Sequence, residues 1–245
     1  MTRTTMRSRS RPSALSSREQ SLVWQSASLL LGYPDDRLLT DLPLVRLMAE
    51  ALPTAWREPL SGVVEHLATT PSVDAQAAYV ETFDTRRRHN LYLTYFAHGD
   101  TRKRGVALLR FKQTYLEAGF TVDTDGGGEL PDHLCVVLEF AATVDRDQGR
   151  QLMLDHRAGL ELLRMSLTES GSPWAGAVEA VCATLPALRG DERDAVRRLA
   201  AEGPPAEEVG LSPYGGPAFD ARLQEARRDG GVDLPMPAVR EGAAR

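Results

Sequence analysis

The chain has 245 residues, of which 42% are hydrophobic and 26% charged, a composition typical of one globular domain that can carry tails. Its formal net charge of −5 argues against a dedicated DNA-binding domain, because such domains are usually strongly basic. No run of about 18 apolar residues occurs, so the sequence predicts no membrane-spanning helix. Cys135 and Cys182 lie in apolar stretches without a C-x-x-C spacing, and we expect both to be reduced and buried.

The two ends of the chain differ in composition from its middle. Residues 1–15 are rich in Arg, Ser and Thr and lack the apolar region of a secretory signal, so we expect a disordered basic arm, although its composition also resembles a transit peptide. Residues 203–245 hold many Pro, Gly and charged residues, which predicts a mostly disordered tail with one possible helix over 219–231. The folded domain should therefore span residues 16–202.

The first helix shows how the domain begins. Ser16 and Glu19 have the spacing of a capping box, and an apolar face follows until Gly32 and Pro34 end the helix. Further helices are predicted over 36–48, 55–68, 72–83, 101–118, from Pro131 onward, and over 150–170, 172–185 and 191–202. Asp36, Ser172 and Asp191 are the expected N-caps, with Pro173 at the first helical position after Ser172. Pro43 should bend or break its helix, and Gly119 lies just beyond the end of another.

No stretch shows the alternating Val/Ile/Thr pattern of a strand, and isoleucine is absent. The sequence therefore predicts an all-α, compact, single-domain bundle of about eight to ten helices with disordered tails.

The segment from Asp84 to Lys112 is the most unusual part of the chain. It holds eight Lys/Arg residues against two acids, and aliphatic and aromatic residues interleave with these charges over 91–96. A solvated charged face, a surface for a peptide or a nucleic acid, and a link whose aromatic side chains belong to the core all remain open readings.

Catalytic and metal-binding patterns are missing from the sequence. The histidines do not have the spacing of metal ligands; they are His66, His89, His98, His133 and His156. There is no nucleophile elbow, P-loop or dinucleotide fingerprint, and the acids around residues 126–128 would repel a phosphate. We therefore expect a protein that is not an enzyme and carries no cofactor; a small enzyme stays a rival class without supporting residues.

Three blocks of the sequence resemble the NarJ family, the nitrate reductase delta subunits or molybdenum-cofactor assembly chaperones, within the TorD/DmsD-like redox-enzyme maturation proteins. The blocks are YVETFD (79–84), LYLTYFAHGDTRKRG (91–105), and ELPDHL (129–134) with LEF (138–140), and the resemblance covers about residues 18–200. Cys135 departs from it, since proline is expected there.

The resemblance implies a TorD-like, cytoplasmic chaperone. Such a protein would bind the N-terminal segment of the catalytic alpha subunit of a respiratory nitrate reductase, assist insertion of the molybdenum cofactor, and then leave the mature enzyme. Molybdenum-cofactor biosynthesis proteins are further possible partners, and no nucleic acid is expected. The alternative is a helical nucleic-acid-binding protein that uses residues 86–112, for which a steep loss of affinity with salt would be diagnostic.

On this resemblance we predict the residues of the client site. Apolar contacts are assigned to Tyr79, Phe83, Leu91, Tyr92, Tyr95 and Phe96, and a basic rim to Arg88, Arg102 and Arg104. The groove and its loops are expected to be shaped by Asp84, His98, Gly99, Asp100, Gly105, Glu129, Pro131, Asp132 and His133.

Overall fold

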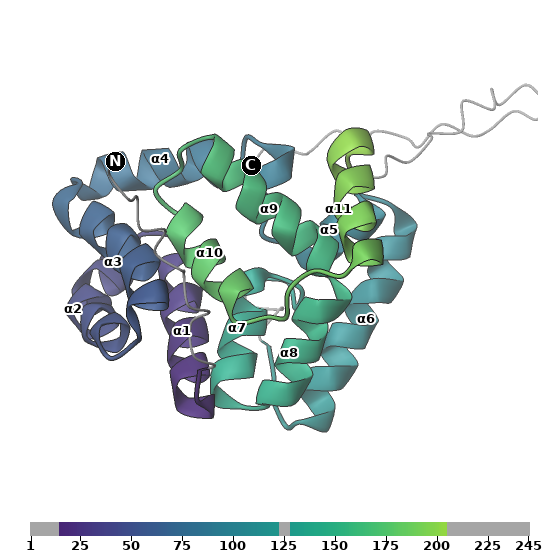
Figure 1. Cartoon of the computed structure of the whole chain (residues 1–245), viewed down its shortest axis with the longest axis horizontal. Helices are drawn as coiled ribbons and strands as arrows, with labels where there is room; N and C mark the ends of the chain where they lie inside the picture. The colour runs from purple at the N-terminus through teal and green to yellow at the C-terminus, as the bar shows by residue number, and fades with distance from the viewer. Residues whose placement is uncertain (1–14, 123–127, 205–245) are drawn as a thin grey trace, which may run out of the picture. The chain divides into compact units, whose positions relative to one another are not determined.

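A computed structural model describes residues 15–122 and 128–204 (Figure 1). All secondary-structure elements within these ranges are helices. The α-helices are α1 Ser17–Leu30, α2 Asp36–Glu50, α3 Thr54–Thr69, α4 Ser72–Phe83, α5 Leu93–His98, α6 Arg102–Glu117, α7 Leu134–Thr143, α8 Arg146–Asp155, α9 Arg157–Glu169, α10 Ala175–Ala183 and α11 Gly190–Glu202, with a short 3-10 helix, η1, at Arg87–His89. The predicted all-α class is confirmed. Of the predicted arm (1–15) and tail (203–245), residues 1–14 and 205–245 lie outside the described residues.

The start of the fold follows the sequence prediction. The Ser16 hydroxyl accepts a hydrogen bond from the Glu19 backbone N–H at 3.3 Å, and the Glu19 carboxylate accepts one from the Ser16 N–H at 2.7 Å. The cap of α2 was predicted one residue late, because Asp35 accepts the Leu38 N–H at 2.8 Å. The predicted break at Pro43 is absent, since α2 runs unbroken past this residue and buries one apolar face on α1 and α3.

The helix predicted over 150–170 is two helices, α8 and α9. They separate at His156, whose backbone leaves the helical region (φ −112°, ψ 23°) and whose ring lies 3.0 Å from the Leu152 carbonyl oxygen. The two halves bury different faces: α8 packs against α7, with Gly149 against Ala141, whereas α9 packs against α5, α10 and α11. A single straight helix could not satisfy both sets of contacts.

Three further boundaries differ from the prediction. α7 begins at Leu134, because residues 131–133 form a turn that pairs with another segment. α10 begins at Ala175, after a turn at residues 172–174. Asp191 lies in the first turn of α11, and the Glu192 carboxylate accepts the Arg189 backbone N–H at 2.6 Å instead.

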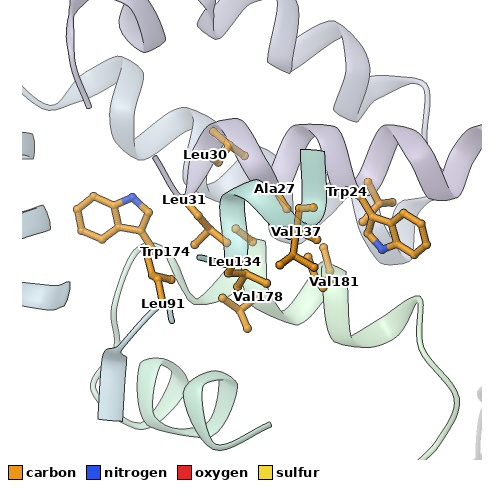
Figure 2. Close-up of a cluster of buried hydrophobic side chains, with 14 of the residues drawn as sticks. Trp24, Ala27, Leu30, Leu31, Leu91, Leu134, Val137, Trp174, Val178 and Val181 are labelled. Atoms are coloured by element: carbon orange, nitrogen blue, oxygen red, sulfur yellow. The ribbon is translucent and has the colours of Figure 1, made fainter. Parts of the chain in front are cut away.

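The core forms where α1, α7 and α10 pack together (Figure 2). Trp24 of α1 and Trp174 before α10 are fully buried, and aliphatic residues such as Leu134 and Val178 fill the space between the helices. The Trp24 indole donates to the Thr184 hydroxyl at 2.9 Å, so its polar nitrogen is satisfied. α2 and α3 lie on one side of this core, and α5, α6 and α11 lie on the other (Figure 1).

Candidate functional site

Two of the blocks that are separate in the sequence meet in the structure. Tyr92 and His133 form an antiparallel bridge, in which the Leu93 N–H donates to the Asp132 carbonyl at 3.0 Å and the Leu134 N–H donates to the Leu91 carbonyl at 2.8 Å. This pairing fixes the starts of α5 and α7 to each other. Residues 91–105 and 129–134 therefore form one local unit, which is called the Asp132 unit below.

Asp132 lies at the centre of this unit and its side chain is fully buried. Its Oδ2 atom accepts hydrogen bonds from the Thr94 backbone N–H at 3.2 Å and from the Thr94 hydroxyl at 2.5 Å, and it lies 3.7 Å from the Arg104 guanidinium. A buried carboxylate requires such partners, because an uncompensated buried charge is strongly destabilising. Asp132 thereby ties α5 and α6 to the turn before α7.

Arg104 reaches this carboxylate from the first turn of α6, and its side chain is only 17% exposed. Its Nε donates to the Thr94 hydroxyl at 3.2 Å, and Nη1 donates to the Asp100 carboxylate at 3.3 Å. The guanidinium also lies over the Tyr92 ring, 5.2 Å from the ring centre. Arg104, predicted as a rim residue, is therefore mostly committed to contacts within the chain.

Tyr92 covers the Asp132 unit on its outer side. Its hydroxyl donates to the Glu129 carboxylate at 2.8 Å, and its ring stands edge-on to His133 at 5.0 Å between ring centres. Burial of the ring, followed by this hydrogen bond, raises the pKa of the Tyr92 phenol. Burial lowers the pKa of His133. Both groups thus favour their neutral forms.

Five of the six residues predicted to contact a client belong to the core in this conformation. Tyr79, Phe83, Leu91, Tyr95 and Phe96 are each at most 8% exposed. The Tyr79 hydroxyl donates to the Leu31 carbonyl at 2.8 Å, and the Tyr79 and Phe83 rings each lie 5.6 Å from the Trp174 ring. Tyr92 is the sixth and is half-buried; it precedes α5, so it does not share a helical face with Phe96.

The remaining predicted rim residues, Arg88 and Arg102, and the predicted groove-shaping residue Asp84 lie at helix ends. Arg88 is exposed and donates to the Ala200 carbonyl at 2.8 Å, which satisfies one of the last carbonyls of α11. Arg102 is exposed at the first position of α6, and Asp84 caps the C-terminus of α4.

Three further residues predicted to shape the groove and its loops, His98, Gly99 and Pro131, lie at the end of α5 and in the turns that follow α5 and precede α7. His98 ends α5, and Gly99 has φ +57°, a conformation that favours glycine and lets the chain turn into α6. The Pro131 carbonyl accepts the Tyr115 hydroxyl at 2.7 Å, which holds the turn against α6. Gly105 instead lies on the exposed face of α6.

A cavity of about 330 Å³ opens between α5, α9 and α11. It is lined by Leu93, Phe96, Ala97, Asp155, His156, Ala158, Gly159, Ala195, Arg198, Leu199, Glu202 and Gly203. A side chain at Gly159 would place its Cβ 2.7 Å from Phe96, so glycine lets α9 approach α5 closely. The α11 wall was missed by the site prediction, although Val196, Leu199 and Ala200 have the spacing of a buried helical face.

Within residues 15–122 and 128–204, no three His, Cys, Asp or Glu side chains are grouped so that they could hold a metal ion. No helix in the same ranges is both long enough and apolar enough to cross a membrane.

The sequence profile of the family described as nitrate reductase delta subunit matches residues 49–180. The chain belongs to this family. The match includes the whole Asp132 unit and ends before α11, and it confirms the resemblance found in the three sequence blocks.

Curated relatives agree with this assignment. The probable nitrate reductase molybdenum cofactor assembly chaperone NarJ of Bacillus subtilis is 30% identical over 170 residues, 68% of this chain and 90% of that protein. The nitrate reductase molybdenum cofactor assembly chaperone NarJ of Escherichia coli K12 is 31% identical over 151 residues, 60% of this chain and 63% of that protein.

A third relative has a different length. The nitrate reductase-like protein NarX of Mycobacterium tuberculosis H37Rv is 43% identical over 163 residues, which are 66% of this chain but 24% of NarX. The chain thus spans about a quarter of NarX.

Proposed function

We propose that this chain is an assembly chaperone for a respiratory nitrate reductase and acts in the cytoplasm. It binds the N-terminal segment of the alpha subunit, keeps this subunit open to insertion of the molybdenum cofactor, and leaves before the enzyme is complete. The observation that carries the proposal is the relation to NarJ of Bacillus subtilis, because the match extends over 90% of a relative named as such a chaperone. Transient contact with molybdenum-cofactor biosynthesis proteins belongs to the same role.

The cavity between α5, α9 and α11 is the proposed client site. Its lining includes the apolar residues Leu93, Phe96 and Leu199 and the charged side chains of Arg198 and Glu202. A volume of about 330 Å³ accommodates a few side chains rather than a whole helix. An amphipathic client segment would insert its apolar side chains there and keep its polar face in solvent.

Under this proposal, the residues predicted to contact the client fall into two groups: those that line the cavity and those that stabilise the surrounding fold. Phe96 lines the cavity directly. Tyr79, Phe83, Leu91 and Tyr95 do not line the cavity; they are buried and stabilise the fold that carries it. The Asp132 unit fixes the start of α5 and Arg88 holds the end of α11, so both set the width of the opening.

The alternative of a nucleic-acid surface over residues 86–112 is weakened because at least three of the eight Lys/Arg residues in this segment already bind groups within the chain. Arg88 donates to Ala200, Arg104 is 17% exposed and pairs with Asp132, and Arg110 pairs with Asp155 at 2.5 Å. Phosphate binding would require these cations to leave partners within the chain.

The molybdenum content of the alpha subunit tests the proposal in cells. The gene for this chain is deleted, and the alpha subunit is purified and analysed for metal. We expect it to lack molybdenum, and the parent chain to restore it. Ala97→Trp, which fills the cavity from its exposed rim, should fail to restore it, whereas Ala55→Trp, at an exposed position on α3, should succeed. Normal molybdenum content in the deletion strain would refute the proposed function.

A further inference from the structure

The outward face of α6 carries an apolar stripe that nothing in the described part of the chain covers. Val106, Leu109 and Leu116 are 71%, 63% and 68% exposed, and Gln113 completes a spacing of three, four and three residues. This is the spacing by which one helix packs against another. α6 contacts its own fold through its opposite face, where Phe111 and Tyr115 are buried, and it lies at the edge of the helices (Figure 1).

Basic side chains border this stripe on both sides. Lys103 and Arg110 lie along one border and Lys112 along the other, at the positions that helical geometry gives them. Arg110 pairs with Asp155, but neither lysine forms an ion pair with an acid of the described residues. α6 contains five Lys/Arg residues and one acid, Glu117; Arg104 and Arg110 pair with acids of the chain, and the exposed Lys103 and Lys112 leave a positive border that favours a negatively charged partner.

Gly105, at one end of the stripe, is a helical glycine with open space around it. A Cβ at this position would meet no atom within 4 Å, in contrast to Gly149 and Gly159, whose missing side chains allow close helix packing. Glycine inside a helix is unfavourable relative to alanine, and nothing within the described chain uses its small size. A partner backbone that approaches α6 closely would use it.

The other end of the stripe offers a small recess. A cavity of about 100 Å³ lies beside Leu116, between it and Tyr115, Phe120 and Val122. This volume is sufficient for one apolar side chain. The stripe therefore has an open approach at Gly105 and an anchor point at Leu116.

We propose that this outward face of α6 is a docking surface for an acidic amphipathic helix of a partner protein, separate from the client cavity. The partner helix carries aliphatic residues at intervals of three and four, flanked by Asp or Glu that meet Lys103 and Lys112. Pairing of α6 with α6 of a second copy is opposed by their like charges. The stripe holds no aromatic side chain on which a base could stack, and the net charge of −5 opposes an anionic membrane.

A synthetic probe tests this surface in the full chain. The probe is a fluorescent 21-residue peptide with Leu at heptad positions a and d, Glu at e and g, and Ala elsewhere, and its control carries Lys in place of Glu. Anisotropy titrations should show tighter binding of the Glu peptide. Leu109→Ser should weaken it by about tenfold or more. Leu44→Ser, a matched change at a residue 56% exposed on α2, should leave it unchanged.

Two glycine substitutions test whether a partner backbone packs closely against α6 at Gly105. Gly105→Gln should weaken binding of the Glu peptide, because the new side chain blocks the approach of the partner backbone. Gly62→Gln on α3 is the control, since a Cβ there also meets no atom within 4 Å. The proposal is overturned if the Glu and Lys peptides bind equally, or if Leu109→Ser binds like Leu44→Ser.

Two further measurements distinguish this surface from other partners. If Leu109→Ser abolishes binding to phosphatidylglycerol vesicles or to single-stranded RNA, while the Glu peptide does not bind the parent, the surface serves one of those ligands and the proposal is wrong. Leu109→Ser should leave the affinity for an alpha-subunit N-terminal peptide unchanged, whether or not the Glu peptide binds. If the alpha peptide instead competes with the Glu peptide, α6 is the client site and the proposed separation fails.

Discussion

The Thr94 hydroxyl donates a hydrogen bond of 2.5 Å to the buried carboxylate of Asp132, and this contact joins two segments that lie 38 residues apart. The same carboxylate lies 3.7 Å from Arg104. Because α5, α6 and the turn before α7 all depend on it, the geometry of the proposed client cavity depends on it as well.

Asp132→Ala should lower the free energy of unfolding by about 3 kcal/mol, because it leaves the Arg104 guanidinium without its buried partner. Chemical denaturation monitored by circular dichroism measures this change. Asp147→Ala, on the exposed surface of α8, serves as the control and should stay within about 0.5 kcal/mol of the parent. Equal stability of the two variants would show that the Asp132 contacts contribute little.

The sequence was sufficient to predict the helical class, the capping box at Ser16 and most helix positions, because these depend on local spacing. It could not show that Asp132 is buried against Thr94 and Arg104, since helix boundaries alone do not determine which loops pair. For the same reason the sequence left open whether the interleaved aromatics form a surface or belong to the core, and the structure buries Tyr95 and Phe96. The spacing of Val106, Leu109 and Leu116 is visible in the sequence, but only the structure shows that these side chains are exposed, because a buried helical face has the same spacing.

Gly159→Ala should destabilise the fold by about 2 kcal/mol, because its Cβ would lie 2.7 Å from Phe96 in a closely packed contact. Gly62→Ala meets no neighbour and should stabilise the fold by roughly 0.5–1 kcal/mol through the helix propensity of alanine. Thermal and urea unfolding of both variants tests the contact between α5 and α9. A neutral Gly159→Ala would mean that these helices can separate without cost.

Stability should also depend on pH through His156. Burial lowers the pKa of His156, against the opposing effects of the Leu152 carbonyl, Asp155 and Asp132, while Arg110 lowers it further. The unfolded chain therefore binds a proton more readily than the folded chain, and the free energy of unfolding should fall as pH drops from about 7.5 to about 5. The contribution of one such histidine approaches about 1.4 kcal/mol per pH unit.

His156→Gln tests this assignment, because it removes the titrating ring and should flatten the dependence on pH. His133 and His66, whose pKa values burial also lowers, should account for part of the remaining slope. Urea unfolding at several pH values gives the slopes directly. An unchanged slope in His156→Gln would assign the effect to other groups.

Arg88→Ala should loosen the end of α11 without unfolding the domain. The bond from Arg88 to the Ala200 carbonyl is exposed, so its loss should raise the hydrogen-exchange rates of the last turn of α11 by about fivefold, with little change in α1 or α7. Mass spectrometry of exchanged peptides measures this change. Uniform acceleration across the chain would indicate global destabilisation instead.

The most direct test of the central claim is calorimetric titration of the full chain with a synthetic peptide from the N-terminus of the nitrate reductase alpha subunit. We expect one binding site on the parent and on Ala55→Trp. On Ala97→Trp, whose new ring fills the cavity between α5, α9 and α11, affinity should fall by about tenfold or more. Absence of binding to the parent would contradict the chaperone assignment, and equal binding by all three proteins would place the client site away from this cavity.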